Sequence, residues 1–290
     1  MSTIQAYTTA TRPSAVGNAG LTIFNTSDKA INVSDGSNWY GYNYDDTSAF
    51  QNRYKLTFDG SGDYANTGYI SGSTAGFSYS LWWNTTNTSS SITPFSNNGT
   101  GNIASWLRPS NGNLYIIFKS GGTTHNFYPQ TPDSNAYSTT NSTGYNRDLC
   151  DGNWHHIVIT FSGTTVKVYT DGTEWISDTL NASYAGGGSQ YVIGRNGNSA
   201  GYYMNGSVDE ISTFEYELTS TQVSDIYNSG TPVHVGSFGL NLSPSGYWRG
   251  GDNDNGTGST VTDLGSGGNN ATLSGNAAIA NIGTGESIYV

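Results

Sequence analysis

The sequence predicts an all-β protein built from two stacked antiparallel sheets, and three observations support this prediction. Residues 154–161 alternate directly after an Asp-Gly turn at 151–152, and both faces of this strand are largely apolar, as in one layer of a sandwich. Two further runs, 165–170 and 173–177, follow across short turns and complete a meander. The chain has 7 Trp, 21 Tyr and 10 Phe, so it can bury a core although only 11% of its residues are charged.

The remaining elements follow the same reasoning in chain order. Two short runs at 20–25 and 29–34 predict an N-terminal β-hairpin. The sandwich strands are expected at 54–59, 63–70, 77–84, 103–108, 113–119, 123–128, 153–161, 165–170, 173–177, 190–194 and 206–215. Within 77–84, Phe77, Tyr79, Leu81 and Trp83 share one face, which predicts a core strand. The one expected helix is 219–228, with Ser220 as its cap and Gly230 as its stop.

Composition changes along the chain predict three regions. Residues 1–50 form an N-terminal hairpin region, residues 51–232 form the sandwich, and residues 233–290 form a Gly- and Asn-rich tail. The tail is too short for a second sandwich, so it either adds edge strands to the first or packs on a neighbouring subunit.

Four ordered motifs resemble the concanavalin A-like jelly roll of the laminin G type. They are LTFDGSGDY at 56–64, DGNWHHIVIT at 151–160, TVKVYTDG at 165–172 and the segment 206–227 that begins GSVDEISTF. The resemblance covers about residues 54 to 230 and implies that the first and last strands of the domain are neighbours. Such sandwiches serve as lectins, adhesins, enzymes and spacers, so the resemblance alone selects no ligand.

The pattern from Arg12 to Tyr40 resembles the short hairpin modules of tail-fibre and other virion proteins of tailed bacteriophages. An ordinary hairpin that leads into the sandwich remains the alternative. A hairpin this small is marginally stable alone, so we expect it to pack against a partner chain or the sandwich.

Charge and targeting signals exclude several classes of function. Ten basic and 21 acidic residues give a net charge of −11, which opposes binding to nucleic acid or anionic membranes. Cys150 is the single cysteine, so no disulfide forms within the chain. No secretory signal and no apolar run of about 18 residues is found, so membrane insertion is not expected.

We predict no catalytic activity. Glucanases of the resembled superfamily present two carboxylates on one strand face, whereas the alternation of 209–215 places Asp209 and Glu210 on opposite faces. A glycoside hydrolase is therefore not the favoured reading.

The resemblance implies a structural Ca²⁺ ion as cofactor, with Asp59, Asp63, Asp209 and Glu210 as ligands. The alternative is that these carboxylates bond backbone amides in turns. His155 and His156 point to opposite faces of their strand, so they cannot hold one metal together and are expected to be structural.

Sugar binding by a lectin-like domain requires exposed aromatic rings and amide side chains in loops. The principal candidates are Trp82, Trp106, Tyr202, Tyr203 and Asn196, and a wider set adds Tyr128, Tyr145, Tyr184 and Asn198. Trp82 is notable because it faces away from the core stripe of its strand.

These observations favour a non-enzymatic virion structural protein of a tailed phage: a fibre, spike or capsid-decoration component. Residues 1–50 would bind other virion proteins, the chain would form a homo-oligomer with a trimer as the working guess, and the sandwich would face outward toward host glycans. The protein would be made in the host cytoplasm and be extracellular on release. The alternative is a bacterial extracellular lectin or adhesin.

Overall fold

The structure is a computed structural model, and its backbone contacts divide the chain into two compact units, Met1–Gln51 and Asn52–Val290. It describes residues 5–8, 10–25, 30–34, 36–37, 39–43, 52–70, 76–87, 92–97, 106–107, 116–120, 123–127, 149–179, 189–197, 201–236, 240 and 242–282.

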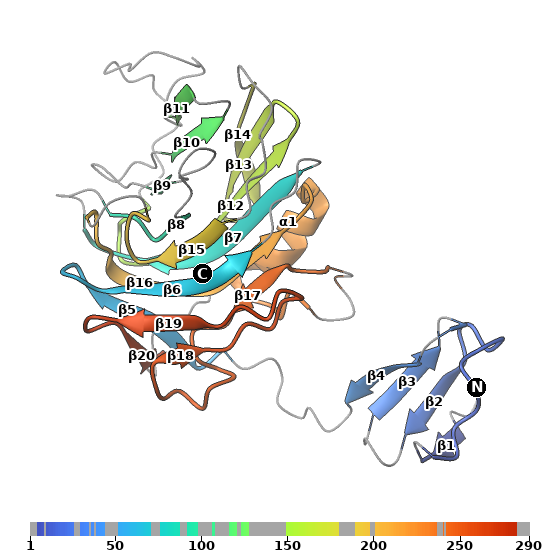
Figure 1. The fold of residues 1–290 in the computed structure, drawn as a ribbon. Coiled ribbons are helices and arrows are strands. Elements are labelled where there is room, and N and C mark those ends of the chain that lie inside the picture. Colours follow the sequence, from blue (N-terminus) through green and yellow to red (C-terminus); the bar gives the residue numbers. More distant parts are fainter. Residues whose placement is uncertain are drawn as a thin grey trace. The chain divides into compact units, whose positions relative to one another are not determined.

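The first unit contains a four-stranded sheet with its strands in sequence order (Figure 1). The strands are β1 (Gln5–Tyr7), β2 (Thr22–Asn25), β3 (Ala30–Ser34) and β4 (Trp39–Asn43). The predicted hairpin is the antiparallel pair β2–β3, and β1 joins β2 in parallel. The Arg12 guanidinium donates to Asn32 Oδ1 at 3.2 Å, and Ser34 Oγ donates to the Ala15 carbonyl at 2.9 Å. These bonds hold the loop before β2 against β3.

The second unit is an antiparallel sandwich, and its larger sheet has eight strands (Figure 1). The order across this sheet is β14 (Thr173–Thr179), β13 (Thr165–Thr170), β12 (Trp154–Ser162), β7 (Phe77–Asn84), β16 (Asn205–Phe214), β5 (Tyr54–Asp59) and β20 (Ala278–Asn281), and β17 (Gly246–Trp248) also pairs with β16. The predicted adjacency of the first and last strands is confirmed, because Leu56 pairs with Val208.

The smaller sheet has five strands, and all its neighbours are antiparallel. The order is β18 (Thr260–Val261), β19 (Ala271–Ser274), β6 (Tyr64–Ile70), β15 (Ser189–Ile193) and β8 (Phe95–Asn97). A separate three-stranded sheet contains β9 (Trp106–Leu107), β10 (Ile116–Ser120) and β11 (Thr123–Phe127).

The main core lies between the two sheets of the sandwich. The predicted stripe of Phe77, Tyr79, Leu81 and Trp83 is buried there from the side of the larger sheet. Tyr191 of the smaller sheet stacks on Phe77 with ring centroids 6.1 Å apart. Burying each such aromatic side chain stabilises the fold by about 1.5–3 kcal/mol, so this stripe is a principal source of stability.

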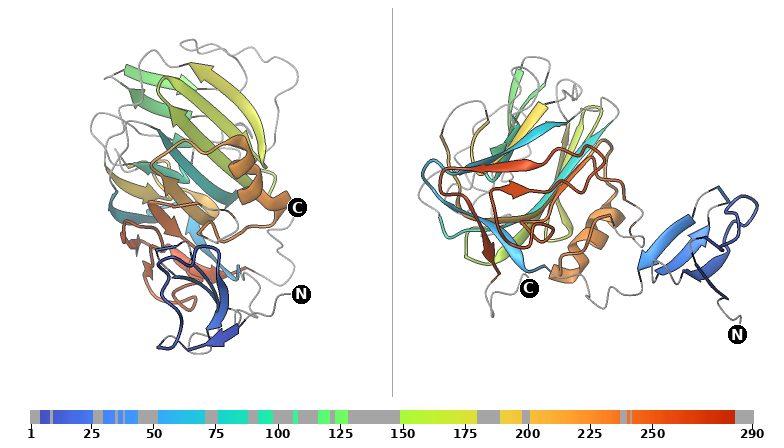
Figure 2. Two further views of the ribbon diagram at one scale, coloured as in Figure 1. Left: turned by 90° about the vertical axis from the view of Figure 1, so that its right-hand side faces the viewer. Right: turned by 60° about the horizontal axis from the view of Figure 1, so that its bottom comes forward.

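Helix α1 (Ser220–Tyr227) covers the other face of the larger sheet (Figure 2). Its Val223 and Ile226 pack into a second core that includes Phe214. The N-cap is Thr219 rather than the predicted Ser220, since the Thr219 hydroxyl accepts from the Gln222 amide in a capping box. A short 3₁₀ turn, η1 (Asn228–Gly230), follows the helix.

The C-terminal segment 242–282 belongs to the second unit. It contributes β17 and β20 to the larger sheet, and β18 and β19 to the smaller one. Among the described residues, no helix has the length and apolar character that crossing a bilayer requires.

Candidate functional site

Three connections meet at one end of the sandwich, and we call their residues the rim. They are the β5–β6 turn (59–64), the described parts of the β15–β16 connection (194–197 and 201–205) and the turn 274–276 after β19. Asn205 pairs with Asp59 across β16 and β5, and the Asn276 amide donates to Asp63 Oδ1. Backbone pairing and side-chain hydrogen bonds therefore hold the three connections together.

The β5–β6 turn is organised by its two carboxylates. Asp63 Oδ2 accepts from the Asp59 amide at 2.8 Å, and Asp59 Oδ1 accepts from the Ser61 amide at 2.7 Å. The hydrogen bond from the Ser61 backbone, joined by one from Asn276, lowers the pKa of the Asp59 carboxyl. Both carboxylates therefore accept hydrogen bonds from backbone amides of the turn, as expected from the alternative to calcium binding.

The β15–β16 connection folds back on itself like a small hairpin. The Met204 amide donates to the Gly194 carbonyl at 2.7 Å, and the Asn196 amide donates to the Gly201 carbonyl at 3.1 Å. Arg195 therefore lies opposite Tyr202 and Tyr203 along the two arms of this connection.

Tyr202 presents the exposed ring of the rim. Its side chain is 40% exposed, which places it among the few exposed large apolar side chains of the described residues. Its φ of 54° is left-handed, and the Tyr202 carbonyl accepts from the Thr93 amide at 2.8 Å. A non-glycine residue held at positive φ costs free energy, and such strain is concentrated at functional sites. Tyr203 is partly exposed beside it, whereas Asn196 is buried.

Arg195 lies over the ring of Tyr64, with its Cζ 4.0 Å from the ring centroid. The pair is a close cation–π contact, which holds the guanidinium plane on the aromatic face. The Arg195 carbonyl accepts from Ser96 Oγ at 2.8 Å, and this bond fixes its backbone to β8.

The four predicted calcium ligands lie in two separate pairs. Asp59 and Asp63 belong to the rim, whereas Asp209 and Glu210 lie beyond the Leu56–Val208 pair, toward the other end of β5. Within the described ranges, no group of three or more His, Cys, Asp or Glu side chains is placed to hold a metal ion. The expectation that one ion joins all four carboxylates does not fit this placement.

Asp209 and Glu210 are the centre of a buried polar cluster that also contains Tyr247, Arg249 and Asp252. Arg249 Nε donates to Glu210 Oε1 at 3.1 Å, and the Tyr247 hydroxyl donates to Glu210 Oε2. Burial raises the pKa of Glu210 to about 7, although Arg249 and Tyr247 oppose the shift. Burial and the charge of Glu210 also raise the pKa of Asp209 well above its ordinary value, although a side-chain hydrogen bond with Asn52 opposes the shift.

A β-bulge explains why both carboxylates of this cluster are buried. The pairing of β16 with β7 shifts register between Asp209 and Ser212, and Glu210 has a φ of 46°. The predicted strict alternation of 209–215 is therefore wrong. Gly250 packs against the cluster at a φ of +55°, where an added Cβ would lie 2.4 Å from Asp209 Oδ1.

Trp82 does face away from the main core, but it is only 1% exposed. Its ring stacks on His156 and on Tyr227 of α1, with centroids 5.0 and 5.7 Å apart. It is therefore not placed as an exposed platform. Trp106 is described only as part of the β9 backbone, and Tyr128, Tyr145, Tyr184 and Asn198 lie outside the described residues.

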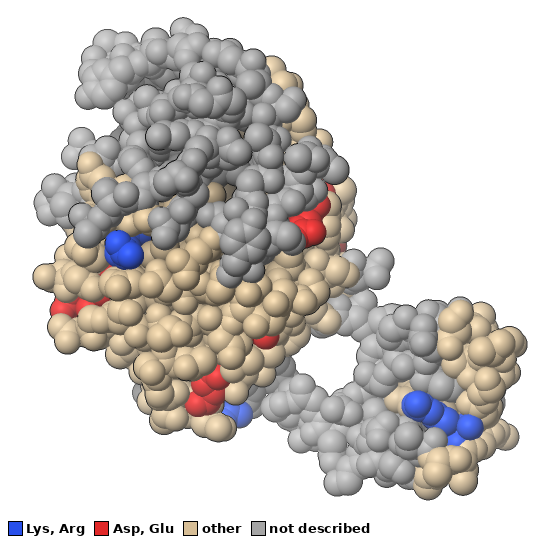
Figure 3. Space-filling model, viewed as in Figure 1, with Lys and Arg blue, Asp and Glu red and all other residues tan. Residues whose placement is uncertain are grey.

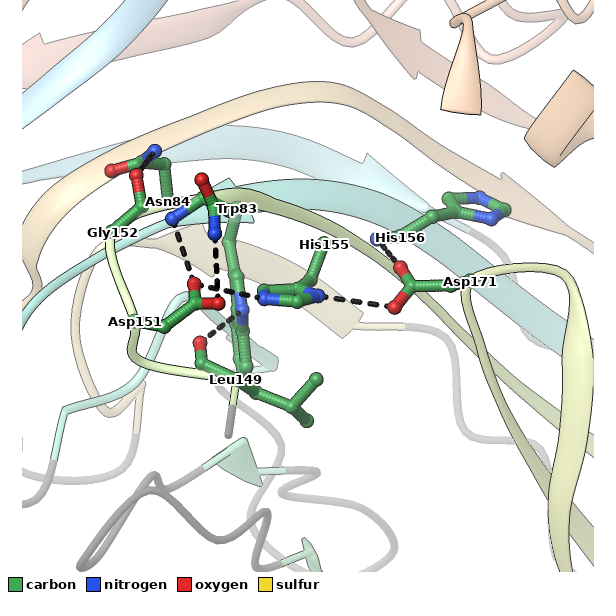
Figure 4. A network of polar contacts seen from close by, with 9 residues as sticks. Trp83, Asn84, Leu149, Asp151, Gly152, His155, His156 and Asp171 are labelled. Atoms are coloured by element: carbon green, nitrogen blue, oxygen red, sulfur yellow. Dashed lines mark hydrogen bonds and ion pairs between the residues drawn. The ribbon is translucent and has the colours of Figure 1, made fainter. Parts of the chain in front are cut away.

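The two adjacent histidines have different surroundings. His156 is buried and hydrogen bonded through Nε2 to Ser80 Oγ at 2.8 Å, and burial lowers its pKa to about 3, so its ring is neutral. His155 lies between two carboxylates: Nδ1 is 3.1 Å from Asp171 Oδ2, and Nε2 is 3.2 Å from Asp151 Oδ1 (Figure 4). We call His155, Asp151 and Asp171 the histidine clasp.

The histidine clasp ties the segment before β12 to the β13–β14 turn (Figure 4). Burial opposes the charge on His155, but the hydrogen bonds and charges of Asp171 and Asp151 outweigh it and raise the pKa of His155. Burial opposes the charge on both aspartates, but the pKa of each is lowered: mainly by the hydrogen bond with His155 at Asp171, and mainly by hydrogen bonds from Asn153, with a smaller contribution from His155, at Asp151. In the histidine clasp, a protonated His155 is paired with the carboxylates of Asp151 and Asp171.

Sequence reasoning missed Arg195, Tyr64, Arg249 and the clasp carboxylates. One signal was available for the clasp, since Asp-Gly turns occur at both 151–152 and 171–172 and a meander brings alternate turns to the same end. No motif pointed to Arg195.

Comparisons with known proteins agree with this architecture. Residues 59–224 match a laminin G family model that is described as the concanavalin A-like lectin/glucanases superfamily. A Bacteroides ovatus protein to which carbohydrate binding has been ascribed superposes with a TM-score of 0.55 at 16% identity, over 87% of this chain and 67% of that one. At this identity the likeness shows the fold alone.

Two further solved structures are similar at lower scores. One is a heptameric SAP-like pentraxin from Limulus polyphemus, with a TM-score of 0.43 and 13% identity over 63% of this chain and 84% of that one. The other is domain 4 of an extracellular GH43 arabinanase from Geobacillus stearothermophilus in complex with arabinotriose, with a TM-score of 0.41 and 19% identity over 60% of this chain and 87% of that one. A search of curated proteins found no match. Because the matched segment exceeds half of the chain and the sheets have the expected order, the chain belongs to the concanavalin A-like lectin/glucanases superfamily.

Proposed function

We propose that this protein is a non-enzymatic, glycan-binding structural component of a tailed-phage particle. The first unit docks on other virion proteins, and the rim of the second unit binds a host surface glycan. The observation that carries the binding half is the rim itself, where an exposed Tyr202 lies opposite Arg195 at the end of a lectin-type sandwich.

The chemistry of the rim suits a saccharide. Sugar rings bind to exposed aromatic faces, and their hydroxyl groups take hydrogen bonds from polar groups held nearby. Tyr202 supplies the ring, and the fixed connections around it supply a rigid frame. The carbohydrate binding ascribed to the Bacteroides ovatus protein is consistent with this use of the fold.

The surroundings of three candidate carboxylates support the non-enzymatic part of the proposal. A retaining glycosidase needs two carboxyl groups about 5–5.5 Å apart on either side of the scissile bond. Glu210 is instead buried and held by Tyr247 and Arg249, and Asp59 and Asp63 are occupied by backbone amides.

The particle half rests on the first unit. Its hairpin pattern resembles modules of phage virion proteins, and it forms a compact sheet of its own. Val16, which is 71% exposed, and Leu21 place exposed apolar side chains on this unit. We include these two side chains in the proposed contact with a partner protein. The described surface of the second unit carries few, scattered charges in the view of Figure 3, as suits an extracellular surface.

One experiment with two matched variants tests both halves. We expect Tyr202→Ala to weaken binding on a glycan array about tenfold or more, because the stacking ring is lost, while Tyr202→Phe keeps most of the affinity. We expect Val16→Asp to prevent incorporation into particles and to leave glycan binding unchanged.

The outcomes separate the candidates. Absence of binding by the wild-type protein to any glycan would remove the lectin function. Normal incorporation of Val16→Asp and of a variant lacking residues 1–50 would contradict the anchor. Glycan binding by a protein that never enters a particle would instead favour the bacterial lectin or adhesin.

A further inference from the structure

The guanidinium of Arg195 is a cation that no carboxylate of the described residues neutralises. Its Nε is buried without a hydrogen-bond partner, and within the described ranges the guanidinium has no hydrogen bond or ion pair. Its contact is the face of Tyr64. A guanidinium has five donors, so a partly buried one without acceptors is an unsatisfied group that a ligand can complete.

Nearby carboxylates do not fill this role. The two carboxylate oxygens of Asp59 accept from the Ser61 backbone amide and the Asn276 side-chain amide. Those of Asp63 accept from the backbone amides of Asp59 and Asn276. These bonds hold both carboxylates in the turn, and neither is within ion-pair distance of Arg195 in the described part of the chain.

Two other cations of the same unit, Lys167 and Arg249, are paired with carboxylates. Lys167 Nζ lies 3.8 Å from Glu217 Oε1, and Arg249 contacts Glu210 and Asp252. An acidic chain with a net charge of −11 has ample carboxylates for this purpose. The lack of a carboxylate partner at Arg195 therefore distinguishes it from Lys167 and Arg249.

We propose that the rim recognises an acidic sugar, and that Arg195 binds its carboxylate. This inference rests on the proposed glycan-binding function and names the class of glycan. The planar fork of a guanidinium matches the two oxygens of a carboxylate, and the Tyr64 ring holds that fork in place. Tyr202, on the opposite arm, supplies the ring on which the sugar stacks.

The test uses the full chain and an array of neutral, uronic-acid, sialic-acid and sulfated oligosaccharides. The tightest carboxylated oligosaccharide and its methyl ester are then titrated by calorimetry. The ester removes the charge and keeps the sugar ring. We expect the ester to bind about 10- to 100-fold more weakly, as loss of a charge-assisted hydrogen bond predicts.

Variants assign this difference to Arg195. In Arg195→Gln the acid should bind as weakly as the ester, and in Arg195→Lys the preference for the acid should be partly restored. Lys167→Gln removes one positive charge from β13 and should leave the affinity unchanged. Thermal unfolding of each variant verifies that it is folded.

The results that overturn the inference differ from those that overturn the proposed function. Equal affinity for acid and ester, a preference for sulfated sugars alone, or wild-type affinity in Arg195→Gln would overturn the carboxylate assignment. Binding of neutral glycans that depends on Tyr202 would also overturn the carboxylate assignment, but it would support the lectin function. Failure to bind every glycan on the array would remove the proposed function itself.

Discussion

Two arginines of the second unit have opposite surroundings. Arg249 is buried between Glu210 and Asp252, with Nε 3.1 Å from Glu210 Oε1 and Nη2 3.5 Å from Asp252 Oδ2. Arg195 rests on Tyr64 and has no carboxylate partner among the described residues. The charge of Arg249 is therefore part of the buried structure, whereas that of Arg195 is available to a ligand at the rim.

The two arginines illustrate how a structural charge differs from one that is available for binding. Burying a charge is tolerated when partners replace the water it loses, and removing one partner then leaves the other uncompensated. A charge without such partners adds little to stability, so we assign the one at the rim to binding. The histidine clasp lies between the two cases, because it is paired but partly exposed.

The largest effect is expected from breaking the buried pair. We predict that Arg249→Met lowers the free energy of unfolding by about 3–5 kcal/mol at pH 8, because Glu210 and Asp252 lose their cation. The loss should be smaller at pH 5, where Glu210, whose pKa is about 7, is protonated. Urea denaturation at both pH values measures this. A loss below about 1 kcal/mol at pH 8 would show that the cluster does not stabilise the fold.

An intermediate effect is expected from the histidine clasp. Because the pKa of His155 is raised in the folded state, its contribution to the free energy of unfolding is complete below pH ~6.5 and is lost as the pH rises through the folded pKa. The lowered pKa of Asp171, to which the hydrogen bond with His155 contributes most, means that its stabilising contribution is present above pH ~4 and is lost on further acidification. The clasp therefore stabilises most between about pH 4 and 6.5.

We predict that Asp171→Asn lowers the free energy of unfolding by about 1–2 kcal/mol at pH 6 and by less at pH 8.5. Asp225→Asn, on the exposed side of α1, is the matched control and should change it by less than about 0.5 kcal/mol. Chemical denaturation at the two pH values gives both numbers. An equal loss at pH 6 and pH 8.5 would contradict a charged clasp.

The smallest effect on stability is expected at the rim. We predict that Arg195→Gln changes the free energy of unfolding by less than about 1 kcal/mol, since only the contact with Tyr64 is lost. Thermal or urea unfolding measures the change. A loss comparable to that of Arg249→Met would mean that Arg195 supports the fold, and the contrast between the two arginines would disappear.

Much of the fold could be predicted from alternation and turns. The strand 77–84 and the meander 154–179 lie close to where the apolar pattern placed them, because a buried strand repeats its side chains every two residues. The adjacency of β5 and β16 came from the family resemblance, since pairing between distant segments leaves no local signal.

The site was predicted only in part. Tyr202 and Tyr203 were among the candidates and lie at the rim, but Asn196 is buried there and Arg195 was not singled out. Trp82 was expected to be exposed because it faces away from the core stripe, yet α1 covers that face. The Glu210 bulge could not be anticipated, because a positive φ at a non-glycine residue is set by tertiary packing.

The strands added by residues 246–281 have a consequence for how the protein is made. β5 pairs with β20, where Leu56 faces Ile279, so partners on one sheet are separated by almost the whole length of the domain. Such long-range pairing slows folding, because closing a large loop costs chain entropy before the stabilising contacts form. A nascent chain that has emerged only as far as α1 still lacks strands from both layers. Closure of the domain therefore follows its translation, and until then the early strands depend on protection from aggregation.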